Sequence, residues 1–261
     1  MSEEHIGALS DKLILEEMKK GRIIIDPFVR ENLNTSSHDV TLGEHFFTEK
    51  HVSSKVEVYN PYDKKNVDRV WGTRSVKATP LRRYLEGHDY FFNTVERIAK
   101  KHDFSMDEIH LPKPYENLFR GIDIDDKIML LMPHETILGH TAEFIGGRGV
   151  ITTMMKARSG IGRSFIEVCK CAGWGDVGYI SRWTMEITNN STKKIIPLVV
   201  GRRIAQLVFV YTGPTLMGDY ARGIDSKYQS STNIEEIKIT WNPSSMLPKL
   251  YKDREVKKAN L

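Results

Sequence analysis

The feature that most constrains the fold of this chain is a succession of short apolar runs between residues 122 and 211. Glycine, proline or an Asn-Asn-Ser triplet interrupts these runs at close spacing, which is typical of short β-strands joined by turns. The pattern predicts a β-barrel or a β-sandwich. The runs are DKIMLLM, ETILGHTAEFI, GVITTMM, SFIEVCK, VGYISRWTMEITNN, KKIIPLVV and RRIAQLVFVYT.

The chain before this region is predicted to form a helix and short strands. Ser10 is a suitable N-cap for the helix, and Gly21 ends it. The run RIIIDPF is a short strand broken by Pro27. Residues 36–47 alternate with a period of two, as a strand does. Asp39 lies in this segment, and we interpret it as a turn-forming or sheet-bridging carboxylate rather than a catalytic one.

Residues from about 50 to 116 lose the strand pattern and become charged, so we interpret them as an insertion into a single domain that covers residues 1–261. Within the insertion, the stretch NTVERIAKK predicts a short helix, and Ser105 with Glu108 forms a capping-box signature for another. From about residue 214 to 261 the chain is a polar tail. This tail either closes over a site or ends in a frayed terminus.

The composition indicates the class of protein and its location. The 261 residues are 40% hydrophobic and 28% charged, which is ordinary for a soluble globular protein. The net charge of +4 suits an anionic small substrate as well as a nucleic acid. No apolar run reaches the length of a membrane span, the N-terminus lacks a signal-peptide pattern, and two cysteines form no disulfide framework. We therefore expect a cytoplasmic protein.

The residues that carry chemistry lie between positions 156 and 191. A glycine-rich turn holds Arg158, Ser159 and Arg163. A phosphate group requires backbone amides without obstructing side chains, a hydroxyl and a cation, so this turn predicts an anion site. The alternative is that the two arginines only pair with acidic neighbours.

Two carboxylates follow the turn. On a strand, Glu186 shares one face with Thr184 and Thr188. It is either a glutamate on a solvated sheet face or a general base in a pocket, where desolvation would raise its pKa and Arg163 would lower it. Asp176 lies between glycines and either caps its own backbone or accepts a hydrogen bond from a sugar hydroxyl.

Two cysteines and two aromatic residues complete the candidates. As strand neighbours Cys169 and Cys171 would face the same way, but two thiolates do not fill a zinc site, and the chain has no C-x-x-C motif. We interpret them as small buried hydrophobic residues and expect no metal site. Trp174 and Tyr220 either wall a planar base or are a core tryptophan and a surface tyrosine.

Motifs along the chain form one combination: ARSGIGR, AGWGDVGYISRWTME, GRRIAQLVF, and Tyr220 ahead of SKYQ. The N-terminal segments LSDKLILEEMKKGRIIIDPF and SSHDVTLG belong with them. The combination resembles the dCTP deaminase family within the dUTPase superfamily. The resemblance implies a mainly β fold, which is a β-barrel-like distorted jelly roll of the dUTPase type with a few peripheral helices. It also implies a homotrimer with sites between subunits.

The resemblance also assigns roles to individual residues. Glu186 would be the general base that activates the attacking water. Ser159 and Arg163 would hold that water and stabilise charge as it adds to C4 of cytosine. The substrate-binding residues implied by the family are Arg158, Ser159, Gly160, Arg163, Ala172, Trp174, Asp176, Thr184, Tyr220, Lys227 and Gln229.

Within that set, each part of the nucleotide has its own residues. The triphosphate would be gripped by Arg158, Ser159, the Gly160 amide and Lys227. Asp176 would bind the deoxyribose 3′-hydroxyl. The pyrimidine would be lined by Ala172 and Thr184, and Tyr220 would pack near sugar and base.

Two departures from the family pattern concern the phosphates. Gly160 stands where the family has a second serine, which removes one donor. Ser231 stands where a glutamine is expected, with Gln229 as the nearby substitute.

The sequence therefore predicts hydrolytic deamination of dCTP to dUTP and ammonia. The triplet Ala172-Gly173-Trp174 is closer to a bifunctional branch that also cleaves dUTP to dUMP and pyrophosphate, and in that alternative Asp176 would orient the water that attacks phosphorus. Two more functions compete on the same fold: a plain dUTPase, whose glycine-rich closing motif the tail lacks, and a non-catalytic nucleotide-binding regulator. We expect no protein-bound cofactor, Mg²⁺ on the triphosphate, and no nucleic-acid or membrane partner; inhibition by dTTP stays open.

Overall fold

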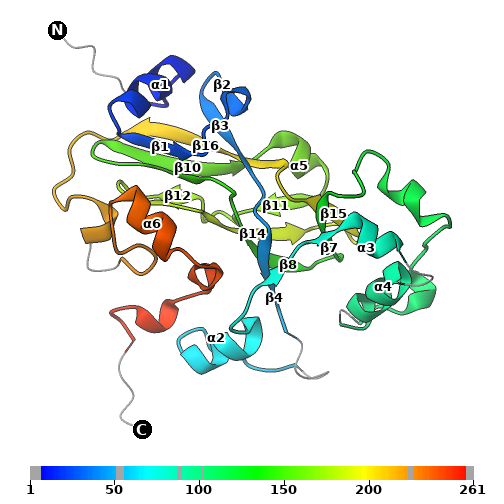
Figure 1. The fold of residues 1–261 in the computed structure, drawn as a ribbon. Helices are drawn as coiled ribbons and strands as arrows, with labels where there is room; N and C mark the ends of the chain where they lie inside the picture. Colours follow the sequence, from blue (N-terminus) through cyan, green and yellow to red (C-terminus); the bar gives the residue numbers. More distant parts are fainter. Residues whose placement is uncertain (1–6, 51–55, 87–89, 102, 223–225, 257–261) are drawn as a thin grey trace.

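The structure, a computed structural model, describes residues 7–50, 56–86, 90–101, 103–222 and 226–256. It is mainly β, with short helices outside the sheets (Figure 1), which confirms the expected fold class. No helix among the described residues is long and apolar enough to span a membrane.

The first five-stranded sheet has the order β12-β10-β16-β3-β2, and all its neighbours are antiparallel. Its strands are β2 (Leu33–Asn34), β3 (Ser37–Thr41), β10 (Ile151–Ala157), β12 (Trp174–Gly175) and β16 (Arg203–Tyr211). The register places Met155 opposite Leu207, and both side chains are buried in the core. The alternating apolar residues that predicted these strands therefore form one face of the core.

The second five-stranded sheet, of order β11-β14-β8-β4-β5, supplies the opposite face of the core. Its strands are β4 (His45–Thr48), β5 (Val76–Lys77), β8 (Thr136–His140), β11 (Ile166–Val168) and β14 (Thr184–Asn189). Two three-stranded sheets complete the β-structure. One contains β1 (Ile23–Asp26), β9 (Phe144–Gly147) and β13 (Ile180–Ser181). The other contains β6 (Thr79–Pro80), β7 (Lys127–Leu131) and β15 (Ile196–Val199). Each predicted apolar run contributes at least one strand.

The N-terminal helix α1 (Asp11–Lys19) forms as predicted. The Ser10 hydroxyl accepts from the Leu13 amide at 3.4 Å, which satisfies one of the free amides of the first turn. Gly21 follows with a φ of +68°, a left-handed conformation that favours glycine and ends the helix. The following strand β1 also ends where predicted, before Pro27.

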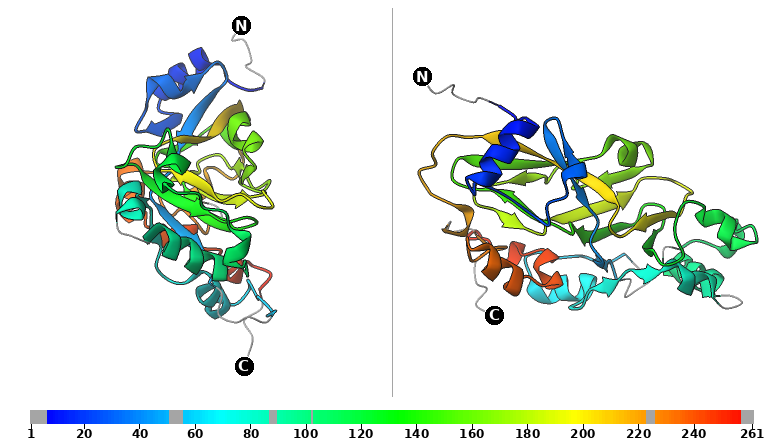
Figure 2. Two further views of the ribbon diagram at one scale, coloured as in Figure 1. Left: turned by 90° about the vertical axis from the view of Figure 1, so that its right-hand side faces the viewer. Right: turned by 45° about the horizontal axis from the view of Figure 1, so that its top comes forward.

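The segment that we interpreted as an insertion is largely helical and packs against the core. It contains α2 (Lys64–Trp71), α3 (Leu81–Leu85), α4 (Tyr90–Lys101) and 3-10 helices at Met106–Glu108 and Tyr115–Phe119. Its strands β5 and β6 pair with core strands β4 and β7, and Val95 of α4 joins a cluster with Val199 of β15. The predicted capping box of Ser105 and Glu108 is present. Figure 2 shows these helices on the side of the molecule that also carries the C-terminal helices.

The C-terminal tail folds back onto the sheets over its described residues. It forms α6 (Ile234–Thr240) and 3-10 helices at Tyr220–Arg222, Pro243–Met246 and Leu250–Lys252. Outside the tail, one more 3-10 helix spans Arg30–Asn32 near the N-terminus. Met246 and Leu247 are buried against Phe47 of β4 and Leu138 of β8. A frayed terminus, one of the two structures expected for the tail, is therefore wrong for residues 226–256.

Candidate active site

Glu186 lies on the outer face of β14, as the period-two pattern predicted. Its strand neighbours Met185 and Ile187 are fully buried in the core, whereas Thr184 and Glu186 are half-buried. Glu186 pairs in register with Leu138 of β8, on which the tail residues Met246 and Leu247 pack. The outer face of this strand pair is therefore partly covered, and Glu186 does not lie on an open solvated sheet face.

The surroundings of Glu186 favour a carboxylate that can exchange protons. Burial raises the pKa of Glu186, while a hydrogen bond from its own backbone amide and the charge of Lys170 lower it. The Glu186 charge in turn adds to burial in raising the pKa values of Cys169 and Tyr179. A carboxylate with a raised pKa is a better proton acceptor than one in water.

The backbone beside Glu186 makes a left-handed turn that the sequence did not predict. Cys169, Lys170 and Cys171 have φ angles of 70°, 34° and 68°, which non-glycine residues rarely adopt. The expectation that both cysteines face one way along a strand is therefore wrong: Cys169 is buried and Cys171 is exposed. The turn begins beside Glu186 on the neighbouring strand: the Cys169 amide donates to the Glu186 carbonyl at 3.0 Å.

This turn positions Lys170 over the face that carries Glu186. The Lys170 ammonium donates to the Thr136 hydroxyl at 3.0 Å, and that hydroxyl lies 2.8 Å from the Thr188 hydroxyl across the β8–β14 pair. Thr188 and Glu186 are two residues apart and share a face of β14. Lys170 could not be predicted as a site residue from the sequence, because no motif indicates three successive left-handed residues.

Tyr179 contacts two further predicted site residues, Tyr220 and Asp176. Tyr179 packs edge-on against Tyr220, with ring centroids 5.3 Å apart. Burial raises the pKa of Tyr220, and the charge of Asp176 adds to this effect. Tyr220 is also fixed through its amide, which donates to the Val177 carbonyl at 2.7 Å. Tyr179, a residue that no sequence motif singled out, thus contacts both Tyr220, through its ring, and Asp176, whose carbonyl accepts from the Tyr179 amide at 2.9 Å.

Ala172 lies just before β12 and Trp174 begins it, both shortly ahead of Asp176 in the sequence. Both side chains are exposed, and Trp174 is not a core tryptophan, since 59% of its surface is accessible. Gly173 between them has a structural cause: a Cβ there would lie 2.3 Å from the Met155 carbonyl oxygen of β10. The close approach of the two backbones requires glycine at this position.

Two of the predicted site residues in the tail, Lys227 and Gln229, form contacts within the chain. The Lys227 ammonium forms an ion pair with Asp253. Gln229 is buried, and its amide oxygen accepts from the Ile180 amide at 2.7 Å while its amide nitrogen donates to the Gly178 and Ser231 carbonyls. Gln229 therefore anchors the tail to β13, and a phosphate contact would break these bonds.

The arginine–serine segment forms a short helix instead of the predicted glycine-rich turn. Helix α5 (Ser159–Arg163) follows β10, with Arg158 at its N-cap and with Ser159, Gly160 and Arg163 exposed. Arg158 pairs with the buried carboxylate of Asp39 at 3.2 Å.

Arg203 of β16 approaches the same oxygen of Asp39 at 3.1 Å. The buried Asp39 of β3 therefore connects two neighbouring segments of the first sheet, which agrees with its interpretation as a sheet-bridging residue.

Within one chain, α5 and Glu186 lie apart. The register pairs Ile166 of β11, which follows α5, with Asn189 of β14. Glu186 is three residues from Asn189 on β14, which corresponds to about 10 Å between the two at the rise of a strand. The causes of the Glu186 pKa shift include Lys170 but not Arg163, so the expected effect of Arg163 on this pKa is absent among the described residues of a single chain.

The described residues contain no group of three or more His, Cys, Asp or Glu side chains that could hold a metal ion. That the protein holds no resident metal is still a prediction.

Known proteins share this sequence pattern. A family model described as dCTP deaminase-like matches residues 89–212, and this match begins inside the segment that we interpreted as an insertion. A protein of Leptospira biflexa named "dCTP deaminase, dUMP-forming" is 31% identical over 183 residues, covering 70% of this chain and 91% of its own length. The chain belongs to the dCTP deaminase family. This confirms the resemblance seen in the sequence.

Two further known proteins are similar to this chain to different degrees. A protein of Methanococcus vannielii with the same name is 28% identical over 227 residues, 87% of this chain and 92% of its own length. A crystal structure of 2′-deoxycytidine 5′-triphosphate deaminase from Agrobacterium tumefaciens aligns with a TM-score of 0.43 and 15% identity, over 78% of this chain and 48% of that chain.

Proposed function

We propose that the protein is a bifunctional enzyme that converts dCTP to dUMP in the cytoplasm, releasing ammonia and pyrophosphate. The observation that carries this proposal is the half-buried Glu186, whose pKa is raised by burial beside Lys170. The relatives named above support dUMP as the product, so dUMP replaces dUTP as the expected end product of the reaction.

In the first step, Glu186 takes a proton from a water molecule whose oxygen attacks C4 of cytosine. The same carboxyl group returns that proton to N3 or to the departing ammonia. Thr184, on the same face of β14, lies against the pyrimidine. The net reaction converts dCTP and one water to dUTP and ammonia, with no change of oxidation state.

In the second step, a water molecule attacks the α-phosphorus of dUTP and displaces pyrophosphate. Asp176, exposed beside Tyr220, both accepts from the 3′-hydroxyl and orients this water. Mg²⁺ carried by the triphosphate neutralises part of its charge. The ring of Tyr220 packs near the sugar.

We also propose that the enzyme is a homotrimer in which α5 of one subunit completes the site of its neighbour. The separation of α5 from Glu186 within the chain supports this arrangement. Ser159 and Arg163 are exposed and available to a second subunit, where they hold the water and the developing charge. Arg158 and the Gly160 amide contact the phosphates.

The test is to incubate the purified protein with dCTP and then with dUTP, and to follow ammonia and pyrophosphate separately. The proposal expects both products from dCTP and pyrophosphate from dUTP. Ammonia without pyrophosphate would indicate a deaminase that stops at dUTP, and pyrophosphate from dUTP alone would indicate a plain dUTPase. Neither product would indicate a nucleotide-binding protein without catalysis.

A further inference from the structure

Trp241, the residue at the end of α6, packs on the outer face of the β8–β14 pair. Its ring centroid lies 4.8 Å from that of His140. His140 pairs in register with Thr184 of β14, so the two side chains point to the same face. The tail therefore attaches to this face at two points, opposite Thr184 through Trp241 and opposite Glu186 through Met246.

Arg182 lies at the centre of the first attachment. Its guanidinium carbon is 4.9 Å from the centre of the Trp241 ring and 4.9 Å from the centre of the Phe144 ring of β9. The two rings meet edge to face, with centroids 6.3 Å apart. A cation over an aromatic face is attracted by the ring quadrupole, and more strongly where water is excluded. The buried Nε of Arg182 has no hydrogen-bond partner among the described residues, so the ring contacts matter more for holding this side chain.

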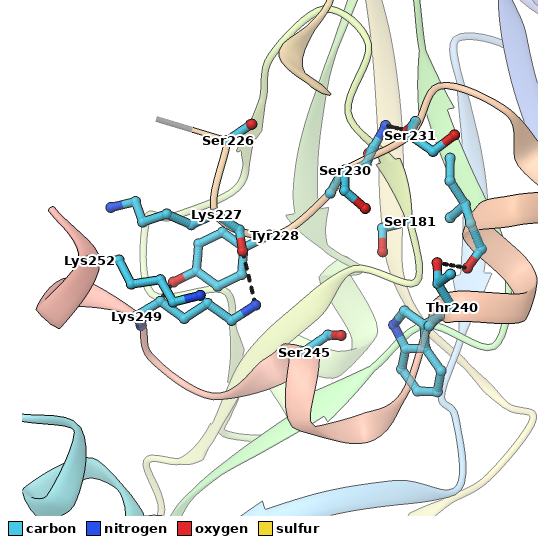
Figure 3. Close-up of a pocket in the computed structure, with 13 residues that line it drawn as sticks. Ser181, Ser226, Lys227, Tyr228, Ser230, Ser231, Thr240, Ser245, Lys249 and Lys252 are labelled. Atoms are coloured by element: carbon cyan, nitrogen blue, oxygen red, sulfur yellow. Dashed lines mark hydrogen bonds between the residues drawn. The ribbon is translucent and has the colours of Figure 1, made fainter. Parts of the chain in front are cut away.

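The rest of α6 and the segment before it also lie against the sheets. Ile237, one turn before the end of α6, is buried in a cluster with Ile180 of β13. Figure 3 shows Ser230 of the tail and Thr240 of α6 close to Ser181 of β13. All of these contacts are made within the chain, so they can form before a nucleotide arrives.

We infer that Trp241 is a positioning residue that keeps the tail folded over the face of Glu186 in the free enzyme. It does so through its contacts with Arg182 and His140. The inference rests on the proposed function, because the covered face is the proposed site of deamination. A tail that folded anew around each nucleotide would weaken binding by the free energy of its own ordering, and a tail already in place avoids this cost. Trp241 therefore acts on KM for dCTP and not on the chemical step.

The first experiment measures dCTP kinetics of Trp241→Ala, of Trp241→Phe, which keeps an aromatic face, and of Ile239→Ala as the matched control. Ile239 lies on the same helix, but 83% of its surface is accessible. Trp241→Ala should raise KM roughly tenfold, the size of one desolvated cation–π contact, with kcat unchanged. Trp241→Phe and Ile239→Ala should keep the original KM. A fall in kcat at unchanged KM would show only a loss of folded protein and would overturn the inference.

A double variant tests whether Trp241 acts through Arg182. Arg182→Met, which keeps an unbranched stem without the charge, should also raise KM. The double variant of Arg182→Met and Trp241→Ala should have no higher KM than Trp241→Ala, because the same contact is lost only once. Effects of the two changes that multiply would overturn the inference.

Hydrogen exchange without nucleotide separates this inference from the proposed function, since it requires no catalysis. The backbone amides of α6 should exchange slowly in the unmodified protein and in Trp241→Phe, and about tenfold faster in Trp241→Ala. Equal exchange in Trp241→Ala and in the unmodified protein would overturn the inference. An unmodified protein that protects α6 but releases no ammonia from dCTP would refute the proposed function, while the attachment of the tail by Trp241 would stand. Melting curves check that each variant retains the fold.

Discussion

Lys170 and Glu186 act on the same outer face of the β8–β14 pair, although the chain brings Lys170 there only through a left-handed turn. Lys170 bonds to Thr136, whose partner Thr188 lies two residues from Glu186. Its charge lowers the pKa of Glu186 against the effect of burial. The lysine thus sets how readily the proposed base is ionised.

Replacing Lys170 with methionine should shift the acid limb of the pH–rate profile. Without the ammonium, burial acts on Glu186 with less opposition and its pKa rises. Because the base works as the carboxylate, activity should then be lost at a higher pH than in the unmodified enzyme. The measurement is kcat for ammonia release across pH. Lys170→Arg should keep the original profile, and an unmoved acid limb in Lys170→Met would remove this role.

Glu186→Gln should abolish ammonia release from dCTP and leave nucleotide binding largely intact. A positioned base contributes roughly 10²–10⁴-fold to the rate, and the amide retains the size of the side chain. Glu167→Gln is the matched control, since Glu167 is a half-buried glutamate on the neighbouring strand β11. Ammonia assays and calorimetric titration of dCTP check the two effects, and retained turnover in Glu186→Gln would refute the base assignment.

The strands and the orientation of Glu186 could be predicted from the sequence, because period-two alternation reports directly which side chains face the core. Lys170 could not, since its position depends on a turn formed by three non-glycine residues. Tyr179 was missed for a related reason: its role comes from ring contacts with Trp183 and Tyr220, and the second of these is distant in the chain.

The packing of the tail is a second feature that could not be predicted from the sequence. Its few apolar residues, such as Met246, give no periodic pattern, yet they pack against β4 and β8. Local sequence does not indicate that such a distant partner exists. Likewise, the motif around Ser159 suggested phosphate chemistry, but it could not indicate that α5 and Glu186 lie apart within one chain.

Arg158 and Arg203 should differ in catalysis although both pair with the buried Asp39. Changing either arginine to alanine leaves that carboxylate with one fewer partner and should destabilise the fold by about 1–2 kcal/mol. Only Arg158→Ala should also raise KM for dCTP, by roughly tenfold, because Arg158 contacts the phosphates in the proposed site. Denaturant unfolding and steady-state kinetics measure the two effects. Equal KM values for the two variants would contradict the phosphate role.

His140 should make the fold sensitive to mild acid. Burial lowers the pKa of His140 to about 4. The neutral ring uses both nitrogens: Nδ1 donates to the Thr141 carbonyl at 2.8 Å, and Nε2 accepts from the His45 amide at 3.2 Å. If Nε2 were protonated, its N–H would face the N–H of His45, and the hydrogen bond between them would be lost.

The sign of the effect follows from the two pKa values. Since an unfolded histidine titrates near 6.5, the unfolded chain binds more protons as the pH falls from about 6.5 to 4. Stability is therefore lost across that window, by an amount of order 3 kcal/mol. In His140→Gln the dependence should flatten, as unfolding free energies at several pH values would show. His110→Gln, at an exposed position, should keep the original slope.

Mixing two inactive variants should restore activity if α5 of one subunit serves Glu186 of another. Arg163→Ala removes the exposed cation of α5, and Glu186→Gln removes the base, so each variant alone should lack deamination. After the subunits are unfolded together and refolded at equal amounts, about a quarter of the sites should combine an intact Arg163 with an intact Glu186. Sites built within single chains would give no recovery, because every chain carries one defect. Ammonia release measured before and after refolding, with each variant refolded alone as the control, therefore decides where the active site lies.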